Sequence, residues 1–151
     1  PGAHDAAATA ASALRTAHYA IVDGFLGCAA CAAVSTLLRE MRAAGELAPG
    51  EVAAGLQRAT RGDLMRWVPL GADAAVPPAL HALLAALDAL VLALQPRLPE
   101  LAGASLMRHE VQATCYPGDG ARYTRHVDDA ARRGRVLTCI LYLNEAWTAA
   151  A

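Results

Sequence analysis

Apolar residues recur at helical spacing in three stretches of the chain. Residues 3 to 17 are rich in alanine, and residues 28 to 44 carry apolar side chains at positions 28, 31, 34, 38 and 41. That spacing places the apolar positions on one stripe of a helix, and Gly45 is a natural C-terminal stop. A third helix is predicted to begin at Pro77-Pro78, since proline is tolerated in the first turn. Its apolar positions follow the i, i+3, i+4, i+7 rule at Leu80, Leu83, Leu84, Leu87, Leu90, Val91 and Leu94.

The pattern changes from helical to extended after Pro99. Residues 105 to 116 alternate roughly between apolar and polar side chains, residues 122 to 128 form a second extended piece, and residues 135 to 144 (R-V-L-T-C-I-L-Y-L-N) give the strongest strand signal. Residues 117 to 120, Pro-Gly-Asp-Gly, predict a turn. Because helices come first and antiparallel strands follow, the chain is predicted to have an α+β fold.

Shorter elements are predicted between the helices. Residues 19 to 23 (Y-A-I-V-D) and 64 to 70 indicate two short strands. Residues 46 to 62 mix glycine, proline and charge, which predicts a loop with one helical turn.

Composition limits the class of protein. The chain has 151 residues, enough for one domain with a buried core. Hydrophobic residues make up 56%, but much of this is alanine, which gives a helix little to bury. A formal net charge of −1 gives no global attraction to nucleic acid or anionic membranes. The most apolar stretch, residues 79 to 94, contains His81 and Asp88 and is closed by Pro96, so no membrane span is predicted.

The two ends predict that the sequence is part of a longer protein. It starts at Pro1 without a signal-peptide pattern and stops at Ala151 without an ending signal. Residues 1 to 151 are therefore expected to form a single, C-terminally incomplete domain. The pattern carries no signal for or against self-association.

Four cysteines are present, at positions 28, 31, 115 and 139. Cys28 and Cys31 form a C-x-x-C pair, which is typical of redox or zinc chemistry. The pair lies inside a helical pattern without a second ligand pair at finger spacing, so free thiols are the favoured interpretation. Free thiols indicate a reducing compartment, cytoplasmic or nuclear.

The clearest chemical motif is His126-Val127-Asp128. In a strand, residues i and i+2 point to the same face, so an imidazole and a carboxylate would lie side by side. Two histidines and one carboxylate on one face of the metal are the ligands of non-haem iron(II) oxygenases. Alone, a His-x-Asp motif is a weak signal.

The surrounding sequence resembles the hypoxia-inducible-factor prolyl hydroxylases, the EGLN or PHD group of 2-oxoglutarate oxygenases. Residues 115 to 128 read C-Y-P-G-D-G-A-R-Y-T-R-H-V-D, and residues 138 to 144 read T-C-I-L-Y-L-N. Both are similar to the family's runs, with matching spacing. Upstream, residues 61 to 67 (R-G-D-L-M-R-W) resemble Arg-Gly-Asp-x-x-x-Trp, and residues 22 to 27 (V-D-G-F-L-G) are near Val-Asp-Asp-Phe-Leu-Gly. The resemblance covers nearly the whole chain after its alanine-rich start.

The resemblance implies a double-stranded β-helix, or jelly roll, of which this chain holds part, supported by the helices at 28 to 44 and 78 to 95. It implies that His126 and Asp128 are two of three Fe(II) ligands. Tyr116, Thr138, Ile140 and Tyr142 would line the 2-oxoglutarate pocket, and alternation in a strand places the last three on one face. Tyr123 would lie near the iron and the substrate. Four further positions would lie on the mobile loop, at the substrate rim or at the entrance: Arg61, Asp63, Trp67 and Arg135.

The implied activity is 4-hydroxylation of proline in a protein substrate, coupled to decarboxylation of 2-oxoglutarate, with L-ascorbate keeping the iron reduced. The substrate would be hypoxia-factor-like or Skp1-like, and neither a nucleic acid nor a membrane is an expected partner. The family's second iron-binding histidine and its 2-oxoglutarate-binding arginine come later than Ala151. The 151-residue piece alone is therefore expected to bind iron weakly, to aggregate and to lack activity. The alternative is a truncated, inert interaction module of the same fold.

Structural interpretations of the same residues remain open. Tyr142 in an apolar strand also suits a core aromatic, and Arg61 with Asp63 also suits a surface pair worth at most ~1 kcal/mol. The sequence Gln112-Ala113-Thr114 is more polar than the family's stretch, which puts the pocket lining in question. The remaining histidines match no family ligand position and are interpreted as non-catalytic, although His109 lies on a neighbouring predicted strand: His4, His18, His81 and His109.

Overall fold

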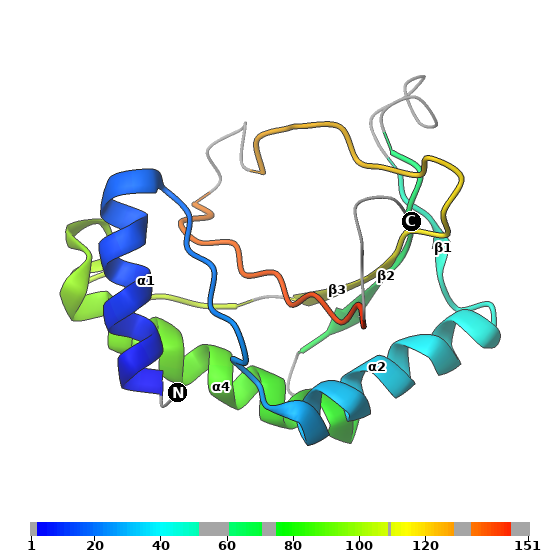
Figure 1. Ribbon diagram of the computed structural model, residues 1–151, viewed down its shortest axis with the longest axis horizontal. Coiled ribbons are helices and arrows are strands. Elements are labelled where there is room, and N and C mark those ends of the chain that lie inside the picture. Colours follow the sequence, from blue (N-terminus) through cyan, green and yellow to red (C-terminus); the bar gives the residue numbers. More distant parts are fainter. Residues whose placement is uncertain (1–2, 52–60, 71–74, 109, 129–133, 146–151) are drawn as a thin grey trace. The chain divides into compact units, whose positions relative to one another are not determined.

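The computed structural model describes residues 3–51, 61–70, 75–108, 110–128 and 134–145 (Figure 1). These fall into two compact units. The helical unit comprises Pro1–Ser35, Pro77–Met107 and Arg135–Ala151, and the sheet unit comprises Thr36–Val76 and Arg108–Gly134. The expectation of one incomplete domain stays a prediction.

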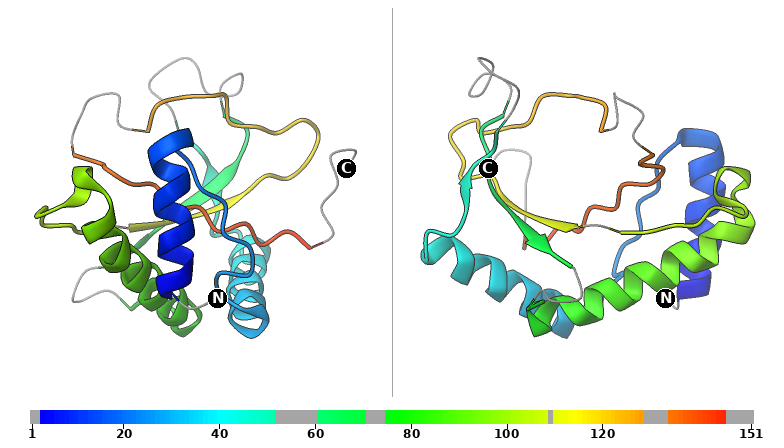
Figure 2. Two further views of the ribbon diagram at one scale, coloured as in Figure 1. Left: turned by 60° about the vertical axis from the view of Figure 1, so that its left-hand side comes forward. Right: turned by 180° about the vertical axis from the view of Figure 1, so that it is seen from behind.

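The core of the helical unit is built where α1 (Ala3–Ala17) crosses the C-terminal half of α4 (Pro78–Leu94) (Figure 2). Two short 3-10 helices, η1 (Gln95–Arg97) and η2 (Pro99–Leu101), continue the chain beyond α4. Four alanines of α1 are buried against leucines of these elements, which corrects the expectation that alanine gives a helix little to bury. The buried cluster consists of Ala6, Ala7, Ala10, Ala11, Leu90, Ala93, Leu94, Leu98 and Leu101.

Helix α4 confirms the predicted third helix and its buried face. Leu80, Leu83, Leu84, Leu90 and Leu94 are all buried along it. Within the described residues, the helical stretch Pro78–Arg97 has a mean hydropathy of 1.7 and is long and apolar enough to cross a membrane by length and composition alone. From the sequence, Pro96 was expected to end the apolar stretch, and no membrane span was predicted. That criterion was too strict, because the helical stretch continues through Pro96 to Arg97. Core helices of soluble proteins pass the same test, and α4 packs against α1.

Helix α2 (Cys28–Ala43) begins in the helical unit and ends in the sheet unit. Its end confirms the predicted stop: Gly45 has φ +72°, and its amide donates to the carbonyl of Arg42 at 3.1 Å. The amide of Glu46 donates to the carbonyl of Met41 at 2.9 Å. These two bonds satisfy carbonyls that the last helical turn leaves open.

The sheet unit holds an antiparallel sheet in the order β1-β2-β3. The strands are β1 (Ala48–Pro49), β2 (Leu64–Pro69) and β3 (Glu110–Cys115). In the register, Leu64 pairs with Cys115 and Trp67 with Gln112. Helices together with this small antiparallel sheet give the chain an α+β fold, as predicted.

Three predicted strands are absent from the hydrogen-bonded sheet of the described residues. Residues 19–23 and 135–144 form no ladder, and residues 122–128 contribute one isolated bridge, between Tyr123 and Arg61. Of the stretch 105–116, only Glu110–Cys115 is paired. Alternation indicates which side chains are buried, but a strand also needs a continuous ladder with a neighbouring segment, and among the described residues these segments form at most one bridge.

Candidate metal centre

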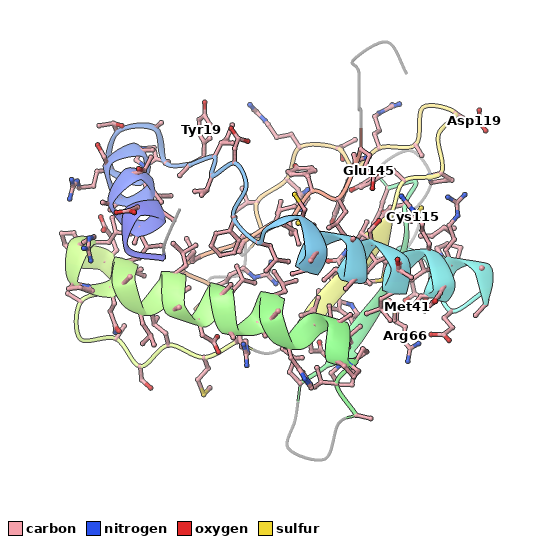
Figure 3. The ribbon with its side chains drawn as sticks, turned by 60° about the horizontal axis from the view of Figure 1, so that its bottom comes forward. Tyr19, Met41, Arg66, Cys115, Asp119 and Glu145 are labelled. Carbon is pink, nitrogen blue, oxygen red and sulfur yellow. The ribbon has the colours of Figure 1, made fainter. Side chains whose placement is uncertain are left out.

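A tight turn after β3 positions the candidate site. Figure 3 labels Cys115, the last residue of β3, and Asp119 in the turn that follows. Gly118, Asp119 and Gly120 have φ of +101°, +53° and +74°, and the amide of Ala121 donates to the carbonyl of Gly118 at 2.9 Å. The turn predicted at residues 117–120 is therefore confirmed.

The returning chain runs beside the start of β2. Tyr123 lies opposite Arg61 in an antiparallel bridge, and the amide of Gly62 donates to the carbonyl of Arg122 at 2.9 Å. A β-carbon at Gly62 would lie 3.3 Å from the α-carbon of Ala121, so glycine permits this close approach. Residues 122 to 128 are thereby fixed near the beginning of β2.

His126 and Asp128 face one another in this segment. Nε2 of His126 lies 3.1 Å from Oδ1 of Asp128, and the two side chains are 39% and 36% exposed. Although residues 122–128 form no strand, the imidazole and the carboxylate lie side by side as the motif predicts.

The hydrogen bonding of His126 suits a metal ligand. Nδ1 of His126 lies 2.9 Å from the carbonyl oxygen of Thr124. A carbonyl only accepts, so Nδ1 carries a proton, while Nε2 faces Oδ1 of Asp128. Two electron-rich atoms at this distance are stabilised by a positive charge between them, either a proton or a metal cation.

The donor set therefore fits a divalent metal such as Fe(II), with imidazole and carboxylate as ligands. A carbonyl that holds the second imidazole nitrogen is the usual partner of a metal-bound histidine. Within the described ranges, no group of three or more His, Cys, Asp or Glu side chains gathers to hold a metal. His126 and Asp128 offer two candidate ligand atoms, Nε2 and Oδ1.

Tyr123 and Arg61 continue the line of contacts from His126. The rings of Tyr123 and His126 stack, with centroids 3.8 Å apart and an interplanar angle of 24°. The guanidinium carbon of Arg61 lies 4.6 Å from the centroid of the Tyr123 ring, a cation–π distance. Tyr123 thus contacts both the candidate metal ligand and a fixed positive charge.

Arg61 is itself held by a buried carboxylate. Its Nε and Nη2 donate to the two oxygens of Asp63 at 2.7 and 3.0 Å, and the side chains are 8% and 0% exposed. The hydrogen bonds to Asp63 raise the pKa of Arg61 above its ordinary value, although burial opposes this shift, so the guanidinium stays charged. The interpretation of Arg61 and Asp63 as a surface pair is wrong, because both residues are buried.

Two further site residues predicted from the sequence lie in the sheet unit. Tyr116 directly follows β3 and is 49% exposed. Trp67 lies in β2 and is 46% exposed. Gln112, the partner of Trp67 in the register, donates to the hydroxyl of Thr114 at 3.1 Å, while Ala113 between them is buried. The polar departure from the family pattern thus lies on the Trp67 face of the sheet.

The remaining predicted site residues belong to the helical unit: Arg135, Thr138, Ile140 and Tyr142. Ile140 and Tyr142 are 69% and 79% exposed, so Tyr142 is not a core aromatic in this structure. Leu137 packs against the buried cluster of the helical unit. Thr138 is exposed, as are Ile140 and Tyr142, whereas Leu141 and Leu143 are half-buried.

Sequence reasoning missed two contributors to the site. Thr124 acts through its backbone carbonyl, which every residue type has, so the sequence held no signal for it. Gly50 has an amide that donates to the carbonyl of Asp63 at 2.9 Å, and a β-carbon there would overlap Nε of Arg61. Glycine next to proline reads only as a turn signal.

The cysteines are free as predicted, whereas the non-catalytic role of the other histidines stays a prediction. His18 and His81 are exposed, and His18 ends α1 with φ +64°. His109 lies outside the described residues, as does the side chain of His4. All four cysteines are free thiols, as predicted.

Comparison with known proteins identifies the family. No family model matches the chain. Human prolyl hydroxylase EGLN3 is 35% identical over 135 residues, which cover 87% of this chain and 55% of that protein. Human Egl nine homolog 1 is 50% identical over 42 residues, covering 28% of this chain and 10% of that protein. The hypoxia-inducible factor prolyl hydroxylase of Caenorhabditis elegans is 27% identical over 137 residues, which cover 85% of this chain and 18% of that protein.

A solved structure agrees with these relatives. The prolyl hydroxylase of Trichoplax adhaerens, in complex with a peptide fragment of the hypoxia inducible factor oxygen degradation domain, superposes with a TM-score of 0.70 and 25% identity. The match covers 84% of this chain and 56% of that chain. The chain belongs to the hypoxia-inducible factor prolyl hydroxylase family. It spans about half the length of the EGLN3 proteins that it matches.

Proposed function

We propose that the full-length protein is an Fe(II)- and 2-oxoglutarate-dependent dioxygenase that hydroxylates C4 of proline in a protein substrate. The observation that carries the proposal is the pairing of His126 Nε2 with Asp128 Oδ1 at 3.1 Å, with Nδ1 held by the carbonyl of Thr124. The similarity to prolyl hydroxylases over 87% of the chain supports it. The same similarity supports a jelly roll in the full-length protein.

The proposed roles of the residues follow the family pattern. His126 and Asp128 would hold the iron, which when bound supplies the redox chemistry of oxygen activation. Tyr116, Thr138, Ile140 and Tyr142 would bind 2-oxoglutarate and exclude water. Arg61, Asp63, Trp67, Tyr123 and Arg135 would shape the substrate side. L-ascorbate would keep the iron in its ferrous state.

For the substrate, we propose a proline-containing segment similar to the oxygen degradation domain of hypoxia-inducible factor. The support is the Trichoplax adhaerens complex, which holds a peptide of that domain. A Skp1-like subunit is the competing substrate, and the two are separated by offering both peptides to the same preparation. Higher kcat/KM for the Skp1-like peptide would overturn the substrate assignment without affecting the reaction class.

The test of the proposed reaction uses the full-length protein with Fe(II), 2-oxoglutarate, ascorbate and a proline peptide. Succinate release and 4-hydroxyproline formation are measured by mass spectrometry. His126→Ala is expected to lower both by more than about 100-fold, because it removes a ligand rather than a ligand's partner. The matched control is His81→Ala on α4, where the side chain is exposed; its activity should equal that of the wild type. Full activity of His126→Ala would refute the assignment.

A further inference from the structure

The imidazole of His126 lacks the support that a sheet would give it. Its segment, residues 122 to 128, makes one bridge at Tyr123 and no ladder among the described residues. The side chain of His126 is 39% exposed, so the surrounding core does not fix its ring. A metal ligand must keep its donor atom aimed at the metal, and this aim is normally set by hydrogen bonds and packing around the ligand.

Apart from the contact with Asp128, two contacts restrain the ring. The carbonyl of Thr124 holds Nδ1, but it lies two residues away on the same irregular segment. The second contact is the Tyr123 ring, which stacks on the imidazole at 3.8 Å and so restricts its rotation. Tyr123 therefore has a geometric role through its ring, separate from any role of its hydroxyl.

The position of Tyr123 is set from the neighbouring β2 segment. Arg61 places its guanidinium 4.6 Å from the Tyr123 centroid. Arg61 cannot swing away at low cost, because Asp63 binds it through two hydrogen bonds and both side chains are buried. Contacts run without a gap from Asp63 through Arg61 and Tyr123 to His126.

We infer that Arg61, anchored by Asp63, is a positioning residue for the metal site: it holds the Tyr123 ring, and that ring aims Nε2 of His126 toward the position shared with Asp128. This inference rests on the proposed function, since it assumes that His126 is a metal ligand. It assigns the Arg61–Asp63 pair a role toward the metal in addition to the substrate-side role proposed above.

The test measures the affinity of the metal-free, full-length protein for Mn(II), an octahedral stand-in for Fe(II), by the electron paramagnetic resonance signal of unbound Mn(II). Arg61→Met and Tyr123→Leu are each expected to raise the Kd about tenfold, in the range found for partners of metal ligands. The double variant should also show about a tenfold rise, since both changes break the same line of contacts. Multiplication to about 100-fold, or no change in either single variant, would overturn the inference.

Matched controls separate positioning from general damage. Arg66 is also an arginine of the β2 region and pairs with Glu46, but its side chain is 44% exposed; Arg66→Met should leave the Kd unchanged. Tyr123→Phe keeps the ring and should retain Mn(II) affinity, and a loss in this variant would contradict a role for the ring. Should Arg61→Met fail to fold, the comparison of Tyr123→Leu with Tyr123→Phe carries the same test.

A second readout does not depend on metal. In the metal-free protein, the Tyr123 ring should shift the His126 Cε1 proton upfield in a ¹H–¹³C spectrum, and Arg61→Met should reduce that shift. His126→Ala distinguishes the two possible failures. Unchanged Mn(II) affinity in His126→Ala would refute the metal site and with it the proposed function. If His126→Ala loses Mn(II) affinity but the effects of Arg61→Met and Tyr123→Leu multiply, the metal site stands and only the positioning role of Arg61 is refuted.

Discussion

At the residue scale, the side chain of Asp63 shows how far local sequence can mislead about environment. The run Arg61-Gly62-Asp63 contains two charges two positions apart, which on its own indicates an exposed pair worth little. In the structure Asp63 is among the largest fully buried side chains. Removing one partner of a buried pair leaves an uncompensated charge and costs about 3–5 kcal/mol. Burial depends on chain segments far along the sequence, so the motif alone could not reveal it.

The close approach of Gly50 to Arg61 gives a test of that burial. Gly50→Ala places a β-carbon on top of Nε of Arg61, so the guanidinium must leave its position against Asp63. We expect a loss of about 1–3 kcal/mol in the free energy of unfolding, the usual cost of overpacking, measured by urea denaturation. In a background of Arg61→Ala the collision is gone, and Gly50→Ala should then cost almost nothing further. Equal costs in both backgrounds would contradict the contact.

The sequence predicted the candidate metal pair, His126 and Asp128, but not the neighbouring groups that hold the site in place. His126 and Asp128 stand out by residue type and spacing, and the structure brings them to 3.1 Å. Thr124 acts through its backbone carbonyl, and Gly50 acts because it has no side chain that would collide with Arg61. Neither property can be recognised from the sequence, because any loop contains backbone carbonyls and many loops contain glycine.

At the scale of elements, the turn between β3 and Tyr123 decides whether the site forms. Three consecutive residues adopt positive φ, and two of them are glycine. This conformation costs other L-residues about 1–2 kcal/mol each. The composition Pro-Gly-Asp-Gly was sufficient to predict the turn, because these residue types are selected by the backbone itself.

Substitution in this turn should therefore act on the site at a distance. Gly118→Ala and Gly120→Ala are expected to lower the free energy of unfolding by about 1–2 kcal/mol each and to weaken the stacking of Tyr123 on His126, seen as a smaller ring-current shift. Asp119→Asn is the control, since asparagine tolerates positive φ at least as well as aspartate. A larger destabilisation from Asp119→Asn than from the alanine variants would contradict the turn geometry.

Helices and strands differed in how well the sequence predicted them. The three helices end within one residue of their predicted limits at Ala17, Ala43 and Leu94, because a helix satisfies its hydrogen bonds within its own segment. Within the predicted strand 135–144, exposed and half-buried side chains alternate only from Ile140 to Asn144. This segment lacks a ladder in the described structure, because pairing depends on a second segment that periodicity does not specify.

At the scale of the whole molecule, the family was accessible from the sequence, while the packing was not. Motifs at residues 61–67 and 115–144 were enough to indicate prolyl hydroxylases, and the relatives confirm that assignment. The role of the alanine-rich start was missed, because alanine content by itself suggests a helix with little to bury. Its four buried alanines show that small side chains serve close approach between α1 and α4.

That close approach can be tested by adding volume. Ala7 is fully buried, and Ala7→Leu is expected to lower the free energy of unfolding by about 1–3 kcal/mol because the added atoms have no space. Ala8 is its exposed neighbour on the same helix, so Ala8→Leu should change stability by less than about 0.5 kcal/mol. Thermal unfolding followed by circular dichroism measures both. Similar losses in the two variants would mean that α1 does not use this face.

The four buried alanines of α1 also affect where the protein can be shortened for expression. An alanine-rich start with no motif is the kind of stretch that is trimmed as an uninformative tail. Deleting it would uncover Leu90, Leu94, Leu98 and Leu101, four leucines that are otherwise shielded from water. A shortened version would then expose an apolar patch and precipitate, and the cause would be the loss of α1, not a defect in the candidate site.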